Sequence, residues 1–159
     1  MKQRSVKLQI KRMEIERKYL VEGESYKLMA VAHHHICQGY ISREKTGTVR
    51  VRIADDKAYL TIKGKPKEGH FARYEWEKEI DVMEAKELMK LCQGTIIDKT
   101  RWIVPADQDL KWEVDEFHGK HEGLVVAEIE LQYEDQVVEL PCFVGKEVTD
   151  DPRYYNANM

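Results

Sequence analysis

The chain has 159 residues, of which 42% are hydrophobic and 35% are charged, and its formal net charge is −3. These values predict one soluble globular domain, argue against a disordered chain, and exclude a strongly basic nucleic-acid surface as the first interpretation. No run approaches the ~20 apolar residues of a membrane-spanning helix, and no secretory signal is visible. Cys37, Cys92 and Cys142 form no CxxC pair, so we expect a cytoplasmic protein without disulfides or a zinc knuckle.

The first predicted strand covers residues 14–21. Side chains alternate between the two faces of a strand, so Glu14, Glu16 and Lys18 share one face and Tyr19 lies on the other. We treat residues 1–12 as an N-terminal extension and residues 13–159 as a single domain, because no linker, repeat or low-complexity tract interrupts the chain.

A short helix is expected over residues 26–32, with Ser25 as its N-cap. Strands are then predicted over residues 38–42, 48–53, 57–64 and 72–80. Asp55 and Asp56 form the turn of a hairpin between the second and third of these.

The second half of the chain opens with a helix. Asp81 and Glu84 have the spacing of a capping box, and Gly94 stands where this helix would end. Four further strands are expected over residues 95–104, 110–117, 124–133 and 136–140. Many alternating strands with few helices predict an antiparallel sheet or barrel with helical additions.

Alternation places a charged stripe opposite an apolar one on most of these strands. The stripes, beyond that of the first strand, are Arg50 and Arg52; Thr61 and Lys63; Glu75, Glu77 and Glu79; Lys99 and Arg101; Glu113 and Asp115; Glu128 and Glu130. A solvated outer face is the simplest interpretation of any single stripe. Two observations weaken it for the whole set: like charges are neighbours, which repel unless something bridges them, and the apolar faces carry three tryptophans that need cover.

A closed sheet with a charged interior explains both observations. Arginine and lysine donate to phosphate oxygens, and paired carboxylates supply the hard oxygen ligands that Mg²⁺ or Mn²⁺ prefers. No Ser/His/Asp arrangement and no glycine-rich phosphate loop is evident. The residues therefore favour metal-assisted phosphoryl transfer to water or to a substrate hydroxyl.

The order of these motifs resembles that of the CYTH superfamily, the triphosphate tunnel metalloenzymes. Glu14-Ile15-Glu16-Arg17-Lys18 is similar to the ExExK signature of that family. The resemblance continues over residues 13–156 through Gln38-Gly39-Tyr40, Arg50-Val51-Arg52, Thr61-Ile62-Lys63, Glu75-Trp76-Glu77, Lys99-Thr100-Arg101, Asp115, Glu128-Ile129-Glu130, Gly145–Thr149 and Arg153-Tyr154. It is greatest to the small bacterial members that act on inorganic tripolyphosphate.

The resemblance implies an α+β fold, a closed eight-stranded antiparallel β-barrel that forms a triphosphate tunnel with a few flanking helices. It implies a substrate-binding set of Lys18, Arg50, Arg52, Lys63, Arg73 and Arg101. Glu14, Glu16, Glu128 and Glu130 would hold a first Mg²⁺ or Mn²⁺. Glu75 and Glu77, with Asp115, would serve a second metal or orient the attacking water. Lys99 would act near the scissile phosphate, positioned by Tyr40.

The function so implied is divalent-metal-dependent hydrolysis of a triphosphate: inorganic tripolyphosphate, or a nucleoside or thiamine triphosphate. The alternatives are a class IV adenylyl cyclase that converts ATP to cAMP and a non-catalytic polyphosphate-binding module. The expected partner is a small-molecule triphosphate, without nucleic acid or membrane, and a homodimer is left open.

Three local patterns have plainer interpretations. His33, His34 and His35 are expected at a surface helix end or in a loop, because three consecutive residues cannot all face one ion on a helix. The basic run from Lys63 to Lys67 is either an anion-attracting loop or a solvated hairpin. Cys37 has no partner histidine and is expected to be a buried structural thiol.

Overall fold

In the computed structural model, which describes residues 14–44, 46–65 and 74–159, nine strands form one antiparallel sheet. The sheet order is β5-β4-β3-β2-β6-β7-β8-β1-β9. The strands are β1 (Ile15–Val21), β2 (Ala32–Glu44), β3 (Gly47–Ala54), β4 (Lys57–Gly64), β5 (Glu75–Ile80), β6 (Gln93–Pro105), β7 (Lys111–Phe117), β8 (Val125–Leu131) and β9 (Val144–Glu147).

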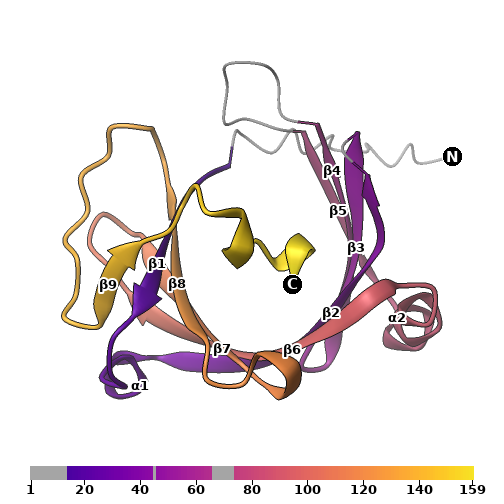
Figure 1. Ribbon diagram of the computed structural model, residues 1–159, viewed down its shortest axis with the longest axis horizontal. Coiled ribbons are helices and arrows are strands. Elements are labelled where there is room, and N and C mark those ends of the chain that lie inside the picture. The colour runs from indigo at the N-terminus through magenta and orange to yellow at the C-terminus, as the bar shows by residue number, and fades with distance from the viewer. Residues whose placement is uncertain (1–13, 45, 66–73) are drawn as a thin grey trace, which may run out of the picture.

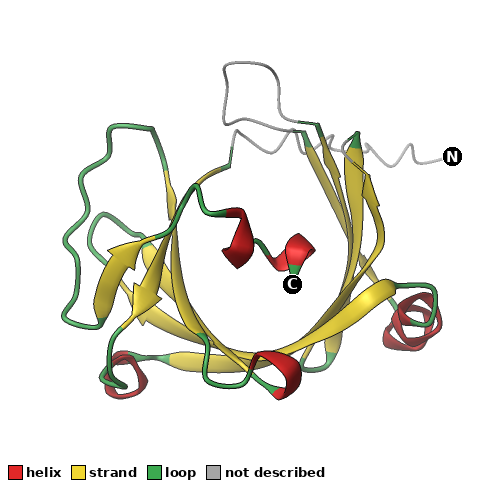
Figure 2. Cartoon of the chain, in the orientation of Figure 1, coloured by secondary structure: helices red, strands yellow, loops and turns green. Residues whose placement is uncertain are grey.

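The helical elements are short. They are α1 (Tyr26–Met29), α2 (Val82–Met89) and three 3₁₀ helices, η1 (Gly119–His121), η2 (Pro152–Tyr154) and η3 (Asn156–Asn158). The sheet is strongly curved, with α1 and α2 on its outer side and the C-terminal η2 and η3 within the curve (Figure 1). Figure 2 shows the same arrangement by element type, with nearly all of the wall built from strands.

The expected closed eight-stranded barrel is wrong. Among the described residues, the edge strand β5 pairs with β4 and the other edge strand β9 pairs with β1, but β5 and β9 do not pair with each other. The contact of β9 with β1 is itself brief, with Tyr19 opposite Glu147, Val21 opposite Val144 and an irregularity between them. Alternation predicts which face a side chain takes, whereas closure depends on strand tilt and stagger, which alternation does not encode.

Some local predictions are confirmed and others are corrected. The β3–β4 hairpin turns at Asp55 and Asp56, and Asp55 takes the left-handed conformation with φ 53° that such a turn requires. His33, His34 and His35 lie inside β2, not at a helix end or in a loop. Residues 136–140 form no strand, and the short β9 follows them instead.

Apolar residues on the outer face of the sheet form two clusters. The larger joins Trp112, Val114 and Ile129 to Tyr26 of α1 and to Phe143. The smaller packs Ala85 of α2 against β3 and β4. The capping box at Asp81 and Glu84 is present and fixes the start of α2. The outer face therefore buries the apolar stripes, which leaves the charged stripes for the inner face.

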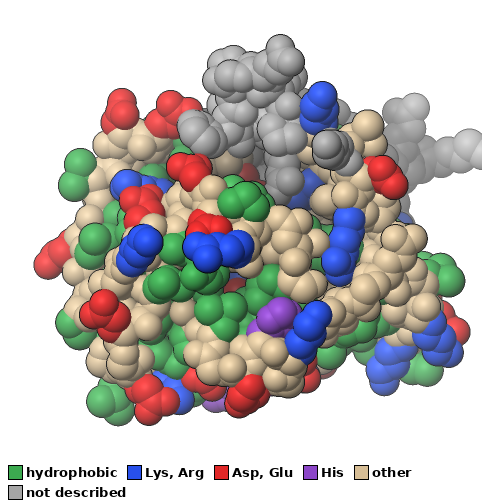
Figure 3. Space-filling model, viewed as in Figure 1, with side chains coloured by type: hydrophobic (Ala, Val, Ile, Leu, Met, Phe, Trp, Pro, Cys, Tyr) green, Lys and Arg blue, Asp and Glu red, His purple; other side chains and the backbone are tan. Residues whose placement is uncertain are grey.

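The inner face carries a third apolar cluster, which holds the C-terminal segment in place. Met159 packs against Tyr40, Ile97, Phe117 and Val126. On the face seen in Figure 3, acidic and basic side chains are interspersed, as the small net charge leads one to expect. In the described ranges, no helix has both the length and the apolar character to cross a membrane. The cytoplasmic location and the homodimer stay predictions.

Candidate active site

The inner face of the sheet encloses a cavity of about 1660 Å³, and most of the predicted site residues line it. These lining residues are Glu14, Glu16, Lys18, Tyr40, Arg50, Arg52, Lys63, Glu75, Glu77, Arg101, Glu128 and Glu130. Lys99 and Asp115 are fully buried in the wall. Arg73 lies outside the described residues. The charged stripes of seven strands thus meet in one place.

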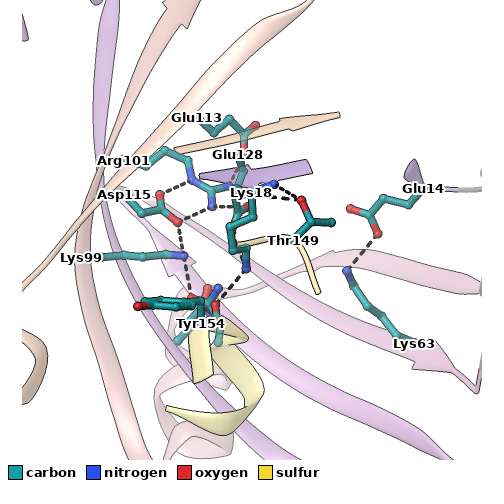
Figure 4. Close-up of polar contacts among 12 residues, drawn as sticks. Glu14, Lys18, Lys63, Lys99, Arg101, Glu113, Asp115, Glu128, Thr149 and Tyr154 are labelled. Carbon is teal, nitrogen blue, oxygen red and sulfur yellow. Dashed lines mark hydrogen bonds and ion pairs between the residues drawn. The ribbon is translucent and has the colours of Figure 1, made fainter. Parts of the chain in front are cut away.

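Asp115 is the centre of a buried ion cluster in the wall of the cavity (Figure 4). Its Oδ2 accepts hydrogen bonds from Lys99 Nζ at 2.6 Å and Arg101 Nη2 at 2.7 Å, and its Oδ1 accepts one from Arg101 Nε at 2.7 Å. Although burial opposes ionisation, Arg101 and Lys99 hold the pKa of Asp115 well below its usual range. Both oxygens of this carboxylate are therefore engaged by cations.

For Lys99, unlike Asp115, burial outweighs the attraction of the oppositely charged neighbour. Burial lowers the pKa of its ammonium to about 8, and the nearby Arg101 and Arg52 act in the same direction, against the attraction of Asp115. Besides Asp115, the ammonium of Lys99 has an acceptor in the C-terminal segment: Asn156 Oδ1 lies 3.1 Å from Lys99 Nζ. Lys99 and Arg101 thus share Asp115, and Arg101 has two further carboxylate neighbours, Glu113 and Glu128.

Lys18 on β1 joins this cluster through Glu128 on β8. The two residues face each other in the strand register, and Lys18 Nζ lies 3.0 Å from Glu128 Oε1. Lys18 also donates to the backbone oxygen of Tyr154 at 3.0 Å. Burial lowers the pKa of Lys18, but Glu128 and Glu16 outweigh it and the net shift is upward. Lys18 is therefore charged at neutral pH.

Arg50 and Arg52 present a second set of donors from β3. Arg52 Nε donates to Gln38 Oε1 at 2.9 Å, and no carboxylate pairs with Arg52 within the described residues. Arg50 Nη2 donates to Thr61 Oγ1 at 3.1 Å and lies 3.5 Å from Glu77 Oε2. Burial, followed by the repulsion of Arg50 and Arg101, lowers the pKa of Arg52 to about 9. A polyanion in the cavity would relieve this repulsion.

Lys63 at the end of β4 completes the basic side. Lys63 Nζ lies 3.0 Å from Glu14 Oε2, a contact visible in Figure 4, and 3.9 Å from Glu75 Oε2. It thus connects Glu14, just before β1, with Glu75 at the start of β5. Thr61, its neighbour on the same face, donates to Glu77 Oε2 at 2.8 Å and so orients that carboxylate.

The acidic side centres on Glu16 and Glu130, which face each other across the β1–β8 pair. Desolvation by the surrounding protein, followed by the repulsion of Glu128, raises the pKa of Glu16 to about 8, even though the side chain remains open to the cavity. A divalent cation would offset this crowding, so the donor set fits the hard-oxygen site expected for Mg²⁺ or Mn²⁺. Within the described residues, no three acidic, histidine or cysteine side chains are already gathered closely enough to ligate an ion.

Several residues that contact this cluster or line the cavity were not predicted from the sequence as site residues, and four of them bear on the chemistry. Glu113 pairs with Arg101, and Thr61 orients Glu77. Both share the inward stripes, so alternation could have identified them. Tyr155 and Asn156 enter the cavity from the C-terminal segment. No sequence pattern marks those two, because Tyr155 lies between η2 and η3 and Asn156 lies in η3, so neither belongs to an alternating strand.

The other local predictions concern residues away from this cluster. Cys37 is half-buried, and burial raises the pKa of its thiol, which disfavours a nucleophilic role. His34 and His35 hydrogen-bond to Asp55 at 2.7 Å and to Asp98 at 2.8 Å. These pairs tie β2 to its neighbouring segments.

Comparison with known proteins adds an independent finding. The CYTH domain family model matches residues 12–155. The inorganic triphosphatase of Acetivibrio thermocellus is 46% identical over 147 residues, covering 92% of each chain. That of Nitrosomonas europaea is 34% identical over 150 residues, covering 90% of this chain and 93% of the relative.

Solved structures agree with this relationship. A crystal structure of the inorganic triphosphatase NE1496 superposes with a TM-score of 0.65 at 29% identity, covering 94% of this chain and 95% of that one. A structure of the adenylyl-cyclase-like protein HpAC1 from Hippeastrum has a TM-score of 0.60 at 18% identity, covering 76% of this chain and 80% of that one, which shows a shared fold.

Proposed function

Because the chain belongs to the CYTH domain family, we propose that it is a divalent-metal-dependent triphosphatase whose substrate is inorganic tripolyphosphate. The observation that carries this proposal is the meeting of basic and acidic stripes around one cavity. A pure anion-binding site needs only the cations. The acidic residues opposite them supply what hydrolysis also needs, a place for a metal and for an oriented water.

The basic residues bind and orient the substrate. Arg50, Arg52, Lys63, Arg101 and Lys18 line the cavity as donors to phosphate oxygens, and Arg73 is added from the sequence alone. The guanidinium groups offer paired N–H donors that match two phosphate oxygens at once. Because these donors come from four different strands, they fix a triphosphate along its length and hold its phosphorus atoms in line for attack.

Glu14, Glu16, Glu128 and Glu130 are proposed to hold Mg²⁺ or Mn²⁺. When bound, the cation supplies neutralisation of charge on the phosphate oxygens. Glu75 and Glu77 are proposed to accept a hydrogen bond from the attacking water, and Thr61 and Arg50 hold Glu77 in one orientation for that purpose. Tyr40 lies on the same inner face, opposite Arg50 in the register.

Lys99 and Asp115 are proposed to act from within the wall. The resemblance gives Asp115 a role at a second metal or in orienting the attacking water, but its three N–H donors support a different role, which is to fix Arg101 and Lys99. Lys99 adds positive potential behind the scissile phosphate, where charge develops on the leaving group.

The test is a panel of tripolyphosphate, ATP and thiamine triphosphate, each with Mg²⁺, Mn²⁺ or EDTA, with products identified. We expect metal-dependent release of phosphate, fastest from tripolyphosphate, and its loss in Glu128→Ala. cAMP as the main product from ATP would contradict the proposal in favour of a cyclase. Tight binding of tripolyphosphate without turnover under any metal would contradict it in favour of a binding module.

A further inference from the structure

Asn156 lies between the buried wall and the cavity and contacts both. It lies at the start of η3, is half-buried and lines the cavity. Behind it are Lys99 and Gln38, which are both fully buried. Lys99 itself is not among the residues that line the cavity. Of the two hydrogen-bond acceptors of Lys99 Nζ in the described part of the chain, Asp115 lies in the wall and Asn156 lines the cavity.

The hydrogen bonds around Asn156 determine which way its amide points. Arg52 can only donate, so Gln38 must accept with Oε1, at 2.9 Å, and its Nε2 is left to donate. Gln38 Nε2 lies 3.4 Å from Asn156 Oδ1, and Lys99 Nζ, also only a donor, lies 3.1 Å from the same oxygen. Two donors therefore fix Oδ1 toward the wall.

This orientation turns the other end of the amide away from the wall. The side-chain hydrogen bonds of Asn156 within the described residues both go to Oδ1. The two N–H groups of Nδ2 face away from Gln38 and Lys99, on a residue that forms part of the cavity surface. An amide nitrogen donates and cannot accept, so its partner in the cavity must be an acceptor, and a phosphate oxygen is one.

The segment that carries Asn156 is anchored on both sides. Met159 and Tyr154 pack in the apolar cluster of the inner face, and Asn158 Nδ2 donates to Pro152 O at 2.9 Å, which ties η3 to η2. The amide is thus held by its backbone as well as by its hydrogen bonds. A donor fixed before the ligand arrives costs little conformational entropy on binding.

We propose that Asn156 is a substrate-binding residue, which donates from Nδ2 to a triphosphate oxygen while its Oδ1 holds Lys99 and, through Gln38, Arg52. The inference rests on the proposed function, because it takes a triphosphate as the ligand. It brings Asn156, the first residue of the C-terminal 3₁₀ helix, into the active site. Arg52, Gln38, Asn156 and Lys99 then form one hydrogen-bonded chain whose outward end is the amide nitrogen.

The experiment compares Asn156→Asp, Asn156→Ala and the control Asn158→Ala in the full chain. Aspartate keeps an acceptor for Lys99 and Gln38 but replaces the N–H donors with a negative oxygen. Asn158→Ala removes the tie between the two 3₁₀ helices without touching Lys99 or Gln38. The measurements are kcat and KM for tripolyphosphate with Mg²⁺, the Kd of tripolyphosphate in EDTA, and the melting temperature of each variant.

We expect Asn156→Asp to raise KM and Kd about tenfold or more while its melting temperature stays near that of the wild type. Asn156→Ala should raise both by a smaller factor, and Asn158→Ala should leave them within about twofold. A Kd within twofold of the wild type in Asn156→Asp would overturn the proposal. So would equal increases in the Asn156 and Asn158 variants, since the segment and not the amide would then matter. Wild-type protein that binds tripolyphosphate without hydrolysing it would contradict the proposed function. The Kd comparison would still test whether Asn156 binds tripolyphosphate, because it needs no turnover.

Discussion

The ammonium of Lys99 and Oδ2 of Asp115 lie 2.6 Å apart, and neither side chain reaches solvent. Asp115 is at the same time bound by two nitrogens of Arg101. One buried carboxylate is thus shared by two buried cations in the wall of the cavity, and it is the one carboxylate within hydrogen-bond distance of Lys99 in the described structure. Burying charges is costly unless each is paired, so the removal of this single carboxylate should affect folding as well as activity.

Asp115→Asn should destabilise the protein by about 3–5 kcal/mol, because it leaves Lys99 and Arg101 buried without their shared anion. The free energy of unfolding is measured by urea titration. The matched control is Glu87→Gln, which breaks the exposed pair with Lys90 on the outer helix and should cost under about 1 kcal/mol.

Acid unfolding gives a second test of the same pair. The folded-state pKa of Asp115 lies below its unfolded value of 3.8, so its stabilisation is fully present above that pH and is lost as the pH falls toward the folded pKa. The wild type should therefore lose stability below about pH 4 more steeply than Asp115→Asn. Equal slopes in the two proteins would show that Asp115 is not held as a carboxylate by its neighbours.

Arg52→Ala should lower kcat/KM for tripolyphosphate by on the order of 10² or more, because Arg52 is a cation facing the cavity without a carboxylate partner in the described structure. Steady-state kinetics with Mg²⁺ measure the change. Lys78→Ala is the control, since Lys78 lies opposite Leu60 on the outer face of β5. Unchanged kinetics in Arg52→Ala would remove Arg52 from the binding site.

Metal affinity should rise with pH and level off above about pH 8. Desolvation and then the repulsion of Glu128 raise the pKa of Glu16 to about 8, so a metal must displace a proton below that pH. Linkage of one proton gives at most about tenfold per pH unit, and screening of this solvent-accessible group reduces the slope. Calorimetric titration with Mn²⁺ from pH 6 to 9 measures it.

In Glu16→Gln the rise of Mn²⁺ affinity with pH should disappear, and the Mn²⁺ affinity should be lower at every pH. Glu79→Gln is the control, because Glu79 follows the stripe of Glu75 and Glu77 but does not line the cavity. Without metal, the raised pKa also means that the protein loses stability as the pH rises from 4.5 through 8. A pH-independent Mn²⁺ affinity in the wild type would exclude Glu16 as a ligand that must lose a proton.

Gly39→Ala should destabilise the protein by about 1–3 kcal/mol, since a Cβ at this position of β2 would lie 2.7 Å from Cys92 Sγ and 2.8 Å from Cys92 Cβ. Because Gly39 separates Gln38 from Tyr40, relief of this overlap should also disturb the inner face and lower activity. Thermal melting and tripolyphosphate hydrolysis measure the two effects. Gly64→Ala, where the nearest contact would be 3.6 Å, should change neither.

Much of the site could be predicted from alternation and motif order. Glu14, Glu16 and Lys18 were placed on one face by strand geometry alone, and the structure brings them to the cavity with Arg50 and Glu128. Asn156 could not be found in this way, because no repeating pattern relates a residue of a 3₁₀ turn to Lys99, which is 57 positions away. The position of His33, His34 and His35 in β2 was also missed, since three polar residues in a row give no alternating signal.

The sequence by itself determined which side chains share a face, because the two-residue period of a strand is a local property of the backbone. It also determined membership of the CYTH family, through the order of its motifs. Only the tertiary structure decided that β5 and β9 do not pair with each other among the described residues, that Asp115 binds two cations, and that the C-terminal segment enters the cavity. Those features depend on contacts between residues far apart in the chain, and local periodicity contains no information about them.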